Sequence, residues 1–120
     1  MIGHTEENKV RMDKTMKITV NREDEKLTVV VDGVINSVTS VEFAKAMTEL
    51  PLEEVKLLLL DFAKVEYISS AGLRVVLATY DRMDGHGAIK IINVSEEVYQ
   101  IFDITGFIGM LDIEVANKAK

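Results

Sequence analysis

Four consecutive leucines, Leu57 to Leu60, lie within a short apolar segment that runs from Val55 to Asp61. A segment this short and this apolar predicts a β-strand that is buried on both faces of a parallel sheet. Parallel neighbours are joined by long crossover connections, which are usually helices. The sequence supplies helices on both sides, because apolar residues recur there at the i, i+3, i+4, i+7 spacing of one helix face. These residues are Phe43, Ala46, Met47 and Leu50 before the strand, and Leu73, Val76, Leu77 and Tyr80 after it.

The sheet is predicted to open with an antiparallel hairpin. A charged segment, residues 22–26, separates an alternating stretch from a β-branched one. Val34 and Ile35 extend the second strand if a bulge occurs at Gly33. The predicted strands are residues 17–21, 27–31, 55–61 and 88–92, with a short edge strand over 110–115.

Capping residues mark the predicted helix ends. Thr39 and Glu42 have the spacing of a capping box at the start of the first helix, and Pro51 ends that helix. Ser95 predicts the start of a third helix, and Gly106 predicts its end. The order β-β-α-β-α-β-α-(β) therefore predicts an α/β fold. We expect a single domain whose mixed β-sheet has an opening antiparallel hairpin and parallel strands packed by about three to four helices.

Length and composition restrict the function classes. The 120 residues suffice for one domain, which we expect at residues 17–116, between a flexible N-terminal extension (1–16) and a C-terminal tail (117–120). A net charge of −6 disfavours binding to nucleic acid or to anionic lipid, and the absence of cysteine excludes disulfides and zinc–thiolate sites. No apolar run approaches the roughly 18–20 residues that cross a bilayer, and the polar N-terminus has no secretory signal. We therefore expect a cytoplasmic protein without direct membrane insertion.

The segment YISSAGLR, from Tyr67 to Arg74, joins the buried strand to the second helix. Either Ser69 or Ser70 can cap a helix that starts near Ala71, because a serine hydroxyl accepts a hydrogen bond from a free first-turn amide. One cap needs only one serine. The other could carry a phosphate at little structural cost, since a helix N-terminus has unpaired N–H groups and a partial positive charge.

A second loop, Asn36–Thr39, also follows a predicted strand. Functional loops of parallel sheets gather beyond the carboxyl ends of the strands. We therefore expect a partner-binding face that comprises Asn36, Ser37, Thr39, Ser69, Ser70, Ala71, Gly72 and Arg74.

The sequence does not favour an enzyme. A serine nucleophile needs a general base within reach, but His4 lies in the N-terminal extension and His86 lies beyond the far end of the second helix. The G-x-S-x-G elbow, the P-loop and the G-x-G-x-x-G motif are absent. Asp81 and Asp84 could bind a metal together with His86, but a solvated helix end is the expected interpretation. We predict no catalytic residue, no metal and no cofactor.

Three segments resemble one known family. They are LLLLDFAKVEYISSAGLRVVLATYDRM, VDGVINSVTSVEFAKAM and VSEEVYQIFDITGF. The first is similar to the signature segment of the STAS domain of anti-sigma factor antagonists. The second is similar to the part of that domain that enters the first helix, and the third to its C-terminal helix. The resemblance covers about residues 17–115, and it implies a single STAS-type domain.

The resemblance implies a non-enzymatic switch. Antagonists of this family bind an anti-sigma factor that is also a serine kinase, and this binding releases the sigma factor for transcription. The kinase then phosphorylates a serine at the start of the second helix, which ends the binding, and a PP2C-type phosphatase reverses the modification. Matched onto this sequence, the acceptor is Ser70, with Ser69 as the less favoured candidate.

Two positions depart from the family pattern. Members often have Asp before the acceptor serine and in the loop after the second strand, where this chain has Ser69 and Asn36. Both changes remove a negative charge, which favours a phosphate but also removes carboxylates that a kinase can use. One alternative is therefore a non-phosphorylated STAS interaction module, such as a cytoplasmic subunit of a lipid ABC transporter or part of a stress-signalling assembly. Another is a small-ligand module, for which only the helix start at Ser70 to Gly72 offers a phosphate site.

Overall fold

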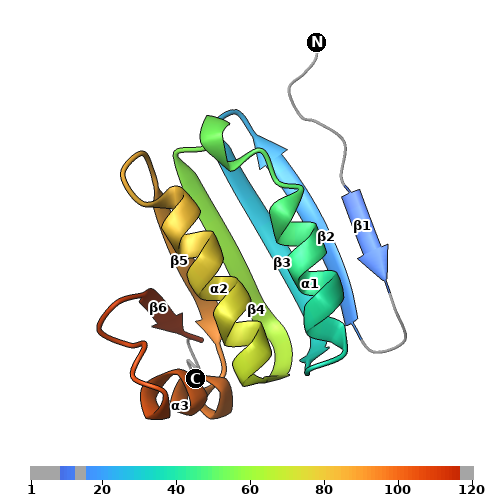
Figure 1. Ribbon diagram of the computed structural model, residues 1–120, viewed down its shortest axis with the longest axis vertical. Helices are drawn as coiled ribbons and strands as arrows, with labels where there is room; N and C mark the ends of the chain where they lie inside the picture. Colours follow the sequence, from blue (N-terminus) through green and yellow to red (C-terminus); the bar gives the residue numbers. More distant parts are fainter. Residues whose placement is uncertain (1–8, 13–15, 117–120) are drawn as a thin grey trace.

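A computed structural model describes the backbone of residues 9–12 and the chain from residue 16 to residue 116. Within these residues, six strands form one sheet in sequence order, with β1 at one edge and β6 at the other (Figure 1). The strands are β1 (Lys9–Met12), β2 (Met16–Glu23), β3 (Lys26–Ile35), β4 (Leu57–Ile68), β5 (Ala88–Val94) and β6 (Asp112–Val115). The helices are α1 (Thr39–Thr48), the short 3-10 helix η1 (Leu52–Glu54), α2 (Ser70–Met83) and α3 (Glu96–Ile104).

The strand directions confirm the predicted mixed sheet. Strand β2 pairs antiparallel with both β1 and β3, whereas β3, β4, β5 and β6 pair in parallel. The β2–β3 pair is the predicted opening hairpin, and its turn holds Asp24 at a left-handed φ of 55°, which Asp tolerates in turns. Helices α1, α2 and α3 each connect two parallel strands, and α1 and α2 lie side by side on one face of the sheet (Figure 1).

Strand β4 is longer than the sequence predicted. The apolar pattern indicated a strand that ends at Asp61, but β4 continues beside β3 to Ile68. The β3–β4 ladder has two register irregularities. Buried side chains recur every second residue up to Phe62 and then every third, at Val65 and Ile68. A test for strict alternation misses this part of the strand, because each bulge shifts the buried position by one residue.

Only one face of β4 is fully buried. Leu58 and Leu60 have no solvent-exposed area, whereas Leu57 and Leu59 on the opposite face are partly exposed. The prediction that this strand is buried on both faces is therefore wrong. The physical reason is that α1 and α2 both lie on one face of the sheet (Figure 1), and Leu58 and Leu60 belong to the core cluster that contains the buried residues of both helices. The apolar run in the sequence reflects a tightly packed face and a second face that is only partly covered.

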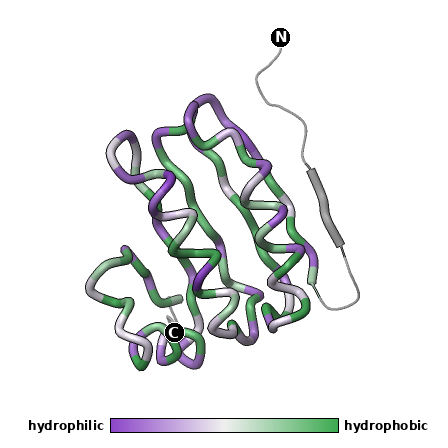
Figure 2. The backbone as a smooth tube through the Cα atoms, in the orientation of Figure 1, coloured by the Kyte–Doolittle hydropathy of each residue, from purple (hydrophilic) through white to green (hydrophobic). Residues whose placement is uncertain are grey.

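The core lies between the sheet and its helices. Phe62 of β4 and Phe102 of α3 have ring centroids 6.5 Å apart, and this contact joins α3 to the sheet. Figure 2 shows hydrophobic residues along the central strands and hydrophilic residues at the β2–β3 turn. The helices bury Phe43, Ala46 and Met47 from α1, Leu73, Val76 and Met83 from α2, and Val98 and Phe102 from α3.

Two short elements were not predicted. Strand β1 pairs with β2 within the segment expected to be a flexible extension, and η1 follows Pro51. Both are too short to give a periodic pattern of their own. Residues 1–8, 13–15 and 117–120, which contain most of the predicted extension and the predicted tail, lie outside the described residues. The domain limits at residues 17 and 116 therefore stay a prediction.

One side chain joins the C-terminal end of α1 to α2. The guanidinium of Arg82 donates hydrogen bonds to the carbonyl oxygens of Met47 at 2.8 Å and Leu50 at 2.9 Å. Each of these carbonyl oxygens also accepts a backbone amide, from Leu50 and Leu52 respectively, so the guanidinium adds a second, charge-assisted bond to each. Arg82 also lies 3.6 Å from the Glu53 carboxylate. A backbone hydrogen bond, and after it the Arg82 charge, lowers the pKa of Glu53 below its ordinary value.

The substitution Arg82→Ala should lower the free energy of unfolding by about 1.5–3 kcal/mol, because it removes charge-assisted hydrogen bonds to two carbonyl oxygens. Urea unfolding followed by circular dichroism measures this loss. Glu53→Gln is the matched control, since it weakens the ion pair but keeps both bonds to α1, and it should change stability little. Equal losses in the two variants would mean that the ion pair, and not the capping of α1, provides the stabilisation.

Candidate functional site

Strands β3 and β4 end side by side, and this brings the two predicted loops together. Ile35 and Ile68 are the last residue pair of their parallel ladder. The amide of Ser69 then donates a hydrogen bond of 2.8 Å to the carbonyl oxygen of Ile35. The Asn36–Thr39 turn and the start of α2 therefore leave the sheet at adjacent positions, at the edge where α1 and α2 both begin (Figure 1).

The side chain of Asn36 organises the turn before α1. Its Oδ1 accepts hydrogen bonds from the amides of Val38 at 2.9 Å and Thr39 at 2.8 Å. The Thr39 hydroxyl in turn accepts from the Asn36 amide at 2.8 Å and donates to the Val34 carbonyl at 2.7 Å. These bonds form a compact turn in which an asparagine replaces a backbone acceptor.

The predicted capping box at Thr39 and Glu42 is wrong in its geometry. Thr39 is the first residue inside α1, and the N-cap position is Val38, which forms no side-chain capping bond. The Thr39 hydroxyl cannot cap its own helix because it bonds the chain that precedes the turn. The amides of Val38 and Thr39 at the start of α1 donate instead to Oδ1 of Asn36, three residues before Thr39.

The two serines of the junction have different surroundings. Ser69 is the N-cap of α2, with an extended backbone, and its Oγ accepts a hydrogen bond of 3.2 Å from the amide of Gly72. Ser70 is the first residue of the helix, and it is exposed. Its hydroxyl forms no hydrogen bond with any residue that the structure describes. The sequence left open which serine caps the helix, and the geometry assigns this task to Ser69.

Gly72 allows the start of α2 to lie close against the ends of the two strands. A Cβ atom at this position would lie 2.6 Å from Cγ2 of Ile35 and 2.8 Å from Cγ1 of Ile68. Real Cβ atoms do not approach carbon atoms this closely, so any larger residue would force the helix or these isoleucine side chains to shift. The absence of a side chain at Gly72 thus allows the start of α2 to lie beside the Asn36–Thr39 turn at the ends of β3 and β4.

The predicted partner-binding residues differ in exposure. Ser37, Ser70 and Arg74 are exposed, Asn36, Ser69 and Ala71 are partly buried, and Thr39 and Gly72 are buried. Thr39 and Gly72 therefore shape this edge from within, and the first group forms its surface.

The apolar part of this surface was not predicted from the sequence. Val38 and Val41, at the start of α1, are 74% and 67% exposed, and Tyr67, at the end of β4, is 47% exposed. Val41 could have been found, because it lies outside the inward-facing stripe of its helix. Tyr67 could not, because the strand was expected to end before it. Exposed apolar side chains that surround polar groups are typical of protein-binding surfaces.

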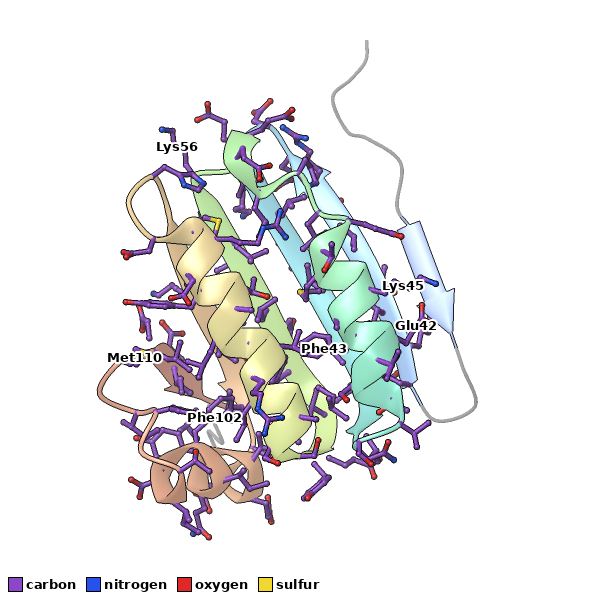
Figure 3. All side chains as sticks on the ribbon, viewed as in Figure 1. Glu42, Phe43, Lys45, Lys56, Phe102 and Met110 are labelled. Carbon is purple, nitrogen blue, oxygen red and sulfur yellow. The ribbon has the colours of Figure 1, made fainter. Side chains whose placement is uncertain are left out.

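A shallow groove of about 200 Å³ runs between α1 and α2, and Arg74 lies on its wall. Figure 3 shows Phe43 pointing from α1 toward α2, whereas Glu42 and Lys45 project from α1 on the side of β1. The groove is lined by Ala44, Met47, Thr48, Arg74, Val75, Ala78, Thr79 and Arg82.

The geometry also bears on the enzymatic alternative. His86 follows the end of α2, and its Nε2 lies 2.8 Å from the carbonyl oxygen of Leu52. Ser70 is at the opposite end of the same 14-residue helix, a separation of about 20 Å at the rise of an α-helix. Among residues 16–116, no three His, Asp or Glu side chains are grouped in a way that could hold a metal ion.

No helix in the described part of the chain is long and apolar enough to cross a membrane.

Comparison with known proteins gives the class of this protein. The family model of the STAS domain matches residues 17–118. The chain therefore belongs to the STAS domain family. Two sequence relatives are described as anti-sigma factor antagonists, and this family is a non-enzymatic regulatory module.

Individual relatives support this assignment. The chain is 28% identical over 105 residues to BtrV of Bordetella bronchiseptica, provisionally described as an anti-sigma factor antagonist, with 87% of this chain and 90% of that protein covered. The structure of an anti-sigma factor antagonist from Mycobacterium paratuberculosis superposes with a TM-score of 0.76, at 21% identity, over 83% of this chain and 86% of that one. These findings confirm the predicted STAS-type α/β fold.

A further structural relative, SpoIIAA from Bacillus, has been solved in two forms. The unphosphorylated form superposes with a TM-score of 0.63 at 15% identity, over 89% of this chain and 87% of that one. The phosphorylated form superposes with a TM-score of 0.58 at 14% identity, over 89% and 90%. At these identities the likeness shows a shared fold.

The two serines should differ in their effect on stability. Ser69→Ala should lower the free energy of unfolding by about 1 kcal/mol, because it removes the cap of α2. Ser70→Ala should stay within about 0.5 kcal/mol of the parent protein, because the Ser70 hydroxyl bonds no described residue. Chemical denaturation of both variants measures the difference. A larger loss for Ser70→Ala would contradict the assignment of the cap.

Proposed function

We propose that this protein is an anti-sigma factor antagonist that is switched off by phosphorylation of Ser70. Its partner is an anti-sigma factor with serine kinase activity, whose capture frees a sigma factor, and a PP2C-type phosphatase restores the binding state. The observation that carries this proposal is the exposed and unbonded Ser70 hydroxyl at the first position of α2, beside an exposed apolar surface. A cytoplasmic location, where sigma factors act, belongs to the same proposal.

Ser70 can accept a phosphate without a change of fold. The Ser70 oxygen forms a bond to the γ-phosphorus of ATP as the bond between that phosphorus and the bridging oxygen breaks. ADP leaves, and the hydroxyl proton passes to a base of the kinase. The capping bond from Gly72 to Ser69 stays intact, because it does not involve Ser70. The first-turn amides and the positive end of the helix favour the new negative charge.

The apolar surface explains why a phosphate would end binding. Val38, Val41 and Tyr67 are exposed at the edge where Ser70 lies. A partner that covers these side chains must also remove water from Ser70. A phosphate adds about −1.5 to −2 charge there, and its desolvation opposes the contact. A cost of ~3 kcal/mol would weaken the affinity by roughly two orders of magnitude.

The acceptor can be identified directly. When the protein is incubated with its partner kinase and ATP, fragmentation mass spectrometry should locate one phosphate on Ser70. Ser70→Ala should bind the partner with or without ATP, since it cannot be switched off. Ser69→Ala is the matched control and should still accept phosphate. Phosphate on Ser69 alone would refute the choice of Ser70.

The apolar surface can be tested separately from the switch. Val41→Asp should weaken partner binding by at least tenfold, because it places a charge within the covered area. Met110→Asp is the matched control, since Met110 is 50% exposed and lies on the side of the molecule away from α1 (Figure 3). Isothermal titration calorimetry with the purified partner measures both affinities. If both variants bind like the parent protein, or both fail, the binding surface lies elsewhere.

A second function is favoured by the neutral residues at Asn36 and Ser69. A kinase that depends on carboxylates at these two positions would not modify this chain, which would then be a STAS interaction module without a switch. Identification of its partner from cell extract distinguishes the two functions. An ATP-binding anti-sigma kinase supports the switch, whereas subunits of a transporter or of a stress-signalling assembly support the alternative.

A further inference from the structure

Arg74 lies one helical turn after Ser70 on α2. Side chains four residues apart on a helix lie on the same face and can touch. Both residues are exposed. The guanidinium of Arg74 forms no ion pair or hydrogen bond with any residue that the structure describes. By contrast, Arg82 on the same helix bonds two carbonyl oxygens and a carboxylate.

None of the residues that line the groove together with Arg74 carries a carboxylate. Across the groove, α1 contributes only the uncharged residues Ala44, Met47 and Thr48 to the lining. The charged residues of α1 that Figure 3 labels, Glu42 and Lys45, project on the side of β1. Within α2, the acidic residue is Asp81, which lies almost two turns beyond Arg74 and is exposed. A permanent positive charge therefore lies one turn from Ser70, with no carboxylate among these groove residues.

We propose that Arg74 is the built-in counter-ion of a phosphate on Ser70. This inference rests on the proposed function, because it assumes that Ser70 is modified. A pair with the acid four residues before the base is the favoured orientation on a helix. The phosphate offers three acceptor oxygens, and a guanidinium can donate two parallel hydrogen bonds to them.

The pair would give the switch two effects from one modification. Before phosphorylation, the Arg74 cation is free to meet an acidic group of the partner at the edge of the apolar surface. After phosphorylation, the same cation is held on its own helix by the phosphate. The partner then loses an attractive charge and meets a new negative one. Neither effect needs a change in the fold of the domain.

The pairing can be measured without any partner protein. Full-length protein with phosphoserine incorporated genetically at position 70 is titrated by phosphorus-31 NMR. A free phosphoserine loses its second proton with a pKa of about 6. A nearby cation favours the dianion, so Arg74 should lower this pKa. Arg74→Gln should therefore raise it by about 0.2–0.4 relative to the phosphorylated parent protein.

Two variants make the measurement specific. Arg74→Lys keeps the charge without the planar donor pair and should restore part of the lowering. Lys56→Gln removes the same charge at the start of β4, at the opposite end of the sheet (Figure 3), and should leave the phosphate pKa unchanged. If Arg74→Gln and Lys56→Gln give the same value, Arg74 does not pair with the phosphate and the inference is overturned.

The titration and the proposed function can fail separately. If no partner kinase modifies Ser70, the proposed function fails even when the titration shows the pair. If the kinase modifies Ser70 and the titration shows no effect of Arg74, the switch stands without this counter-ion. In the supporting case, Arg74→Gln raises the phosphate pKa, and it weakens binding of the unphosphorylated protein to its kinase several-fold.

Discussion

The parallel pairing of β3 with β4 is the interaction on which the rest of the structure depends. The ladder runs from Lys26 beside Leu57 to Ile35 beside Ile68. Because the two strands end together, the turn before α1 and the start of α2 emerge at neighbouring positions. The bond from Ser69 to the carbonyl of Ile35 extends the ladder by one step into the loop region. A shift in register would separate these loops, and no side chain could compensate for it.

The sequence predicted the sheet class, the hairpin, the crossover helices and the junction before α2, because each produces a regular apolar period or a capping residue. It did not predict that β4 reaches Ile68, because bulges change the period of the buried residues. It predicted the Asn36 loop as part of the site but not its bonding. A side chain that accepts amides from Val38 and Thr39 depends on the conformation of the turn, and spacing alone does not reveal it.

The neutral residues at positions 36 and 69 keep the geometry that an acid would provide. Asn36 accepts two amides through one oxygen, and Ser69 accepts one amide through its hydroxyl. An aspartate at either position could form the same bonds, since carboxylates cap helices equally well. The substitution therefore changes charge while it preserves shape. An aspartate at either position would therefore differ from the residue present in its electrostatics and not in the conformation of the two loops.

A switch that leaves the fold intact must act through its surface. The Ser70 hydroxyl contributes no bond to the described structure, so its modification has little native structure to disrupt. Because the Ser70 side chain is exposed and bonds no described residue, a phosphate on it would move with that side chain. Its counter-ion must therefore be carried by another exposed side chain that can follow it. Arg74 meets this requirement because it is exposed and one turn away. The rigid parts of the site, Ser69 and Gly72, hold the helix start in place. In the proposed switch, the change of state is confined to two side chains on one helical face.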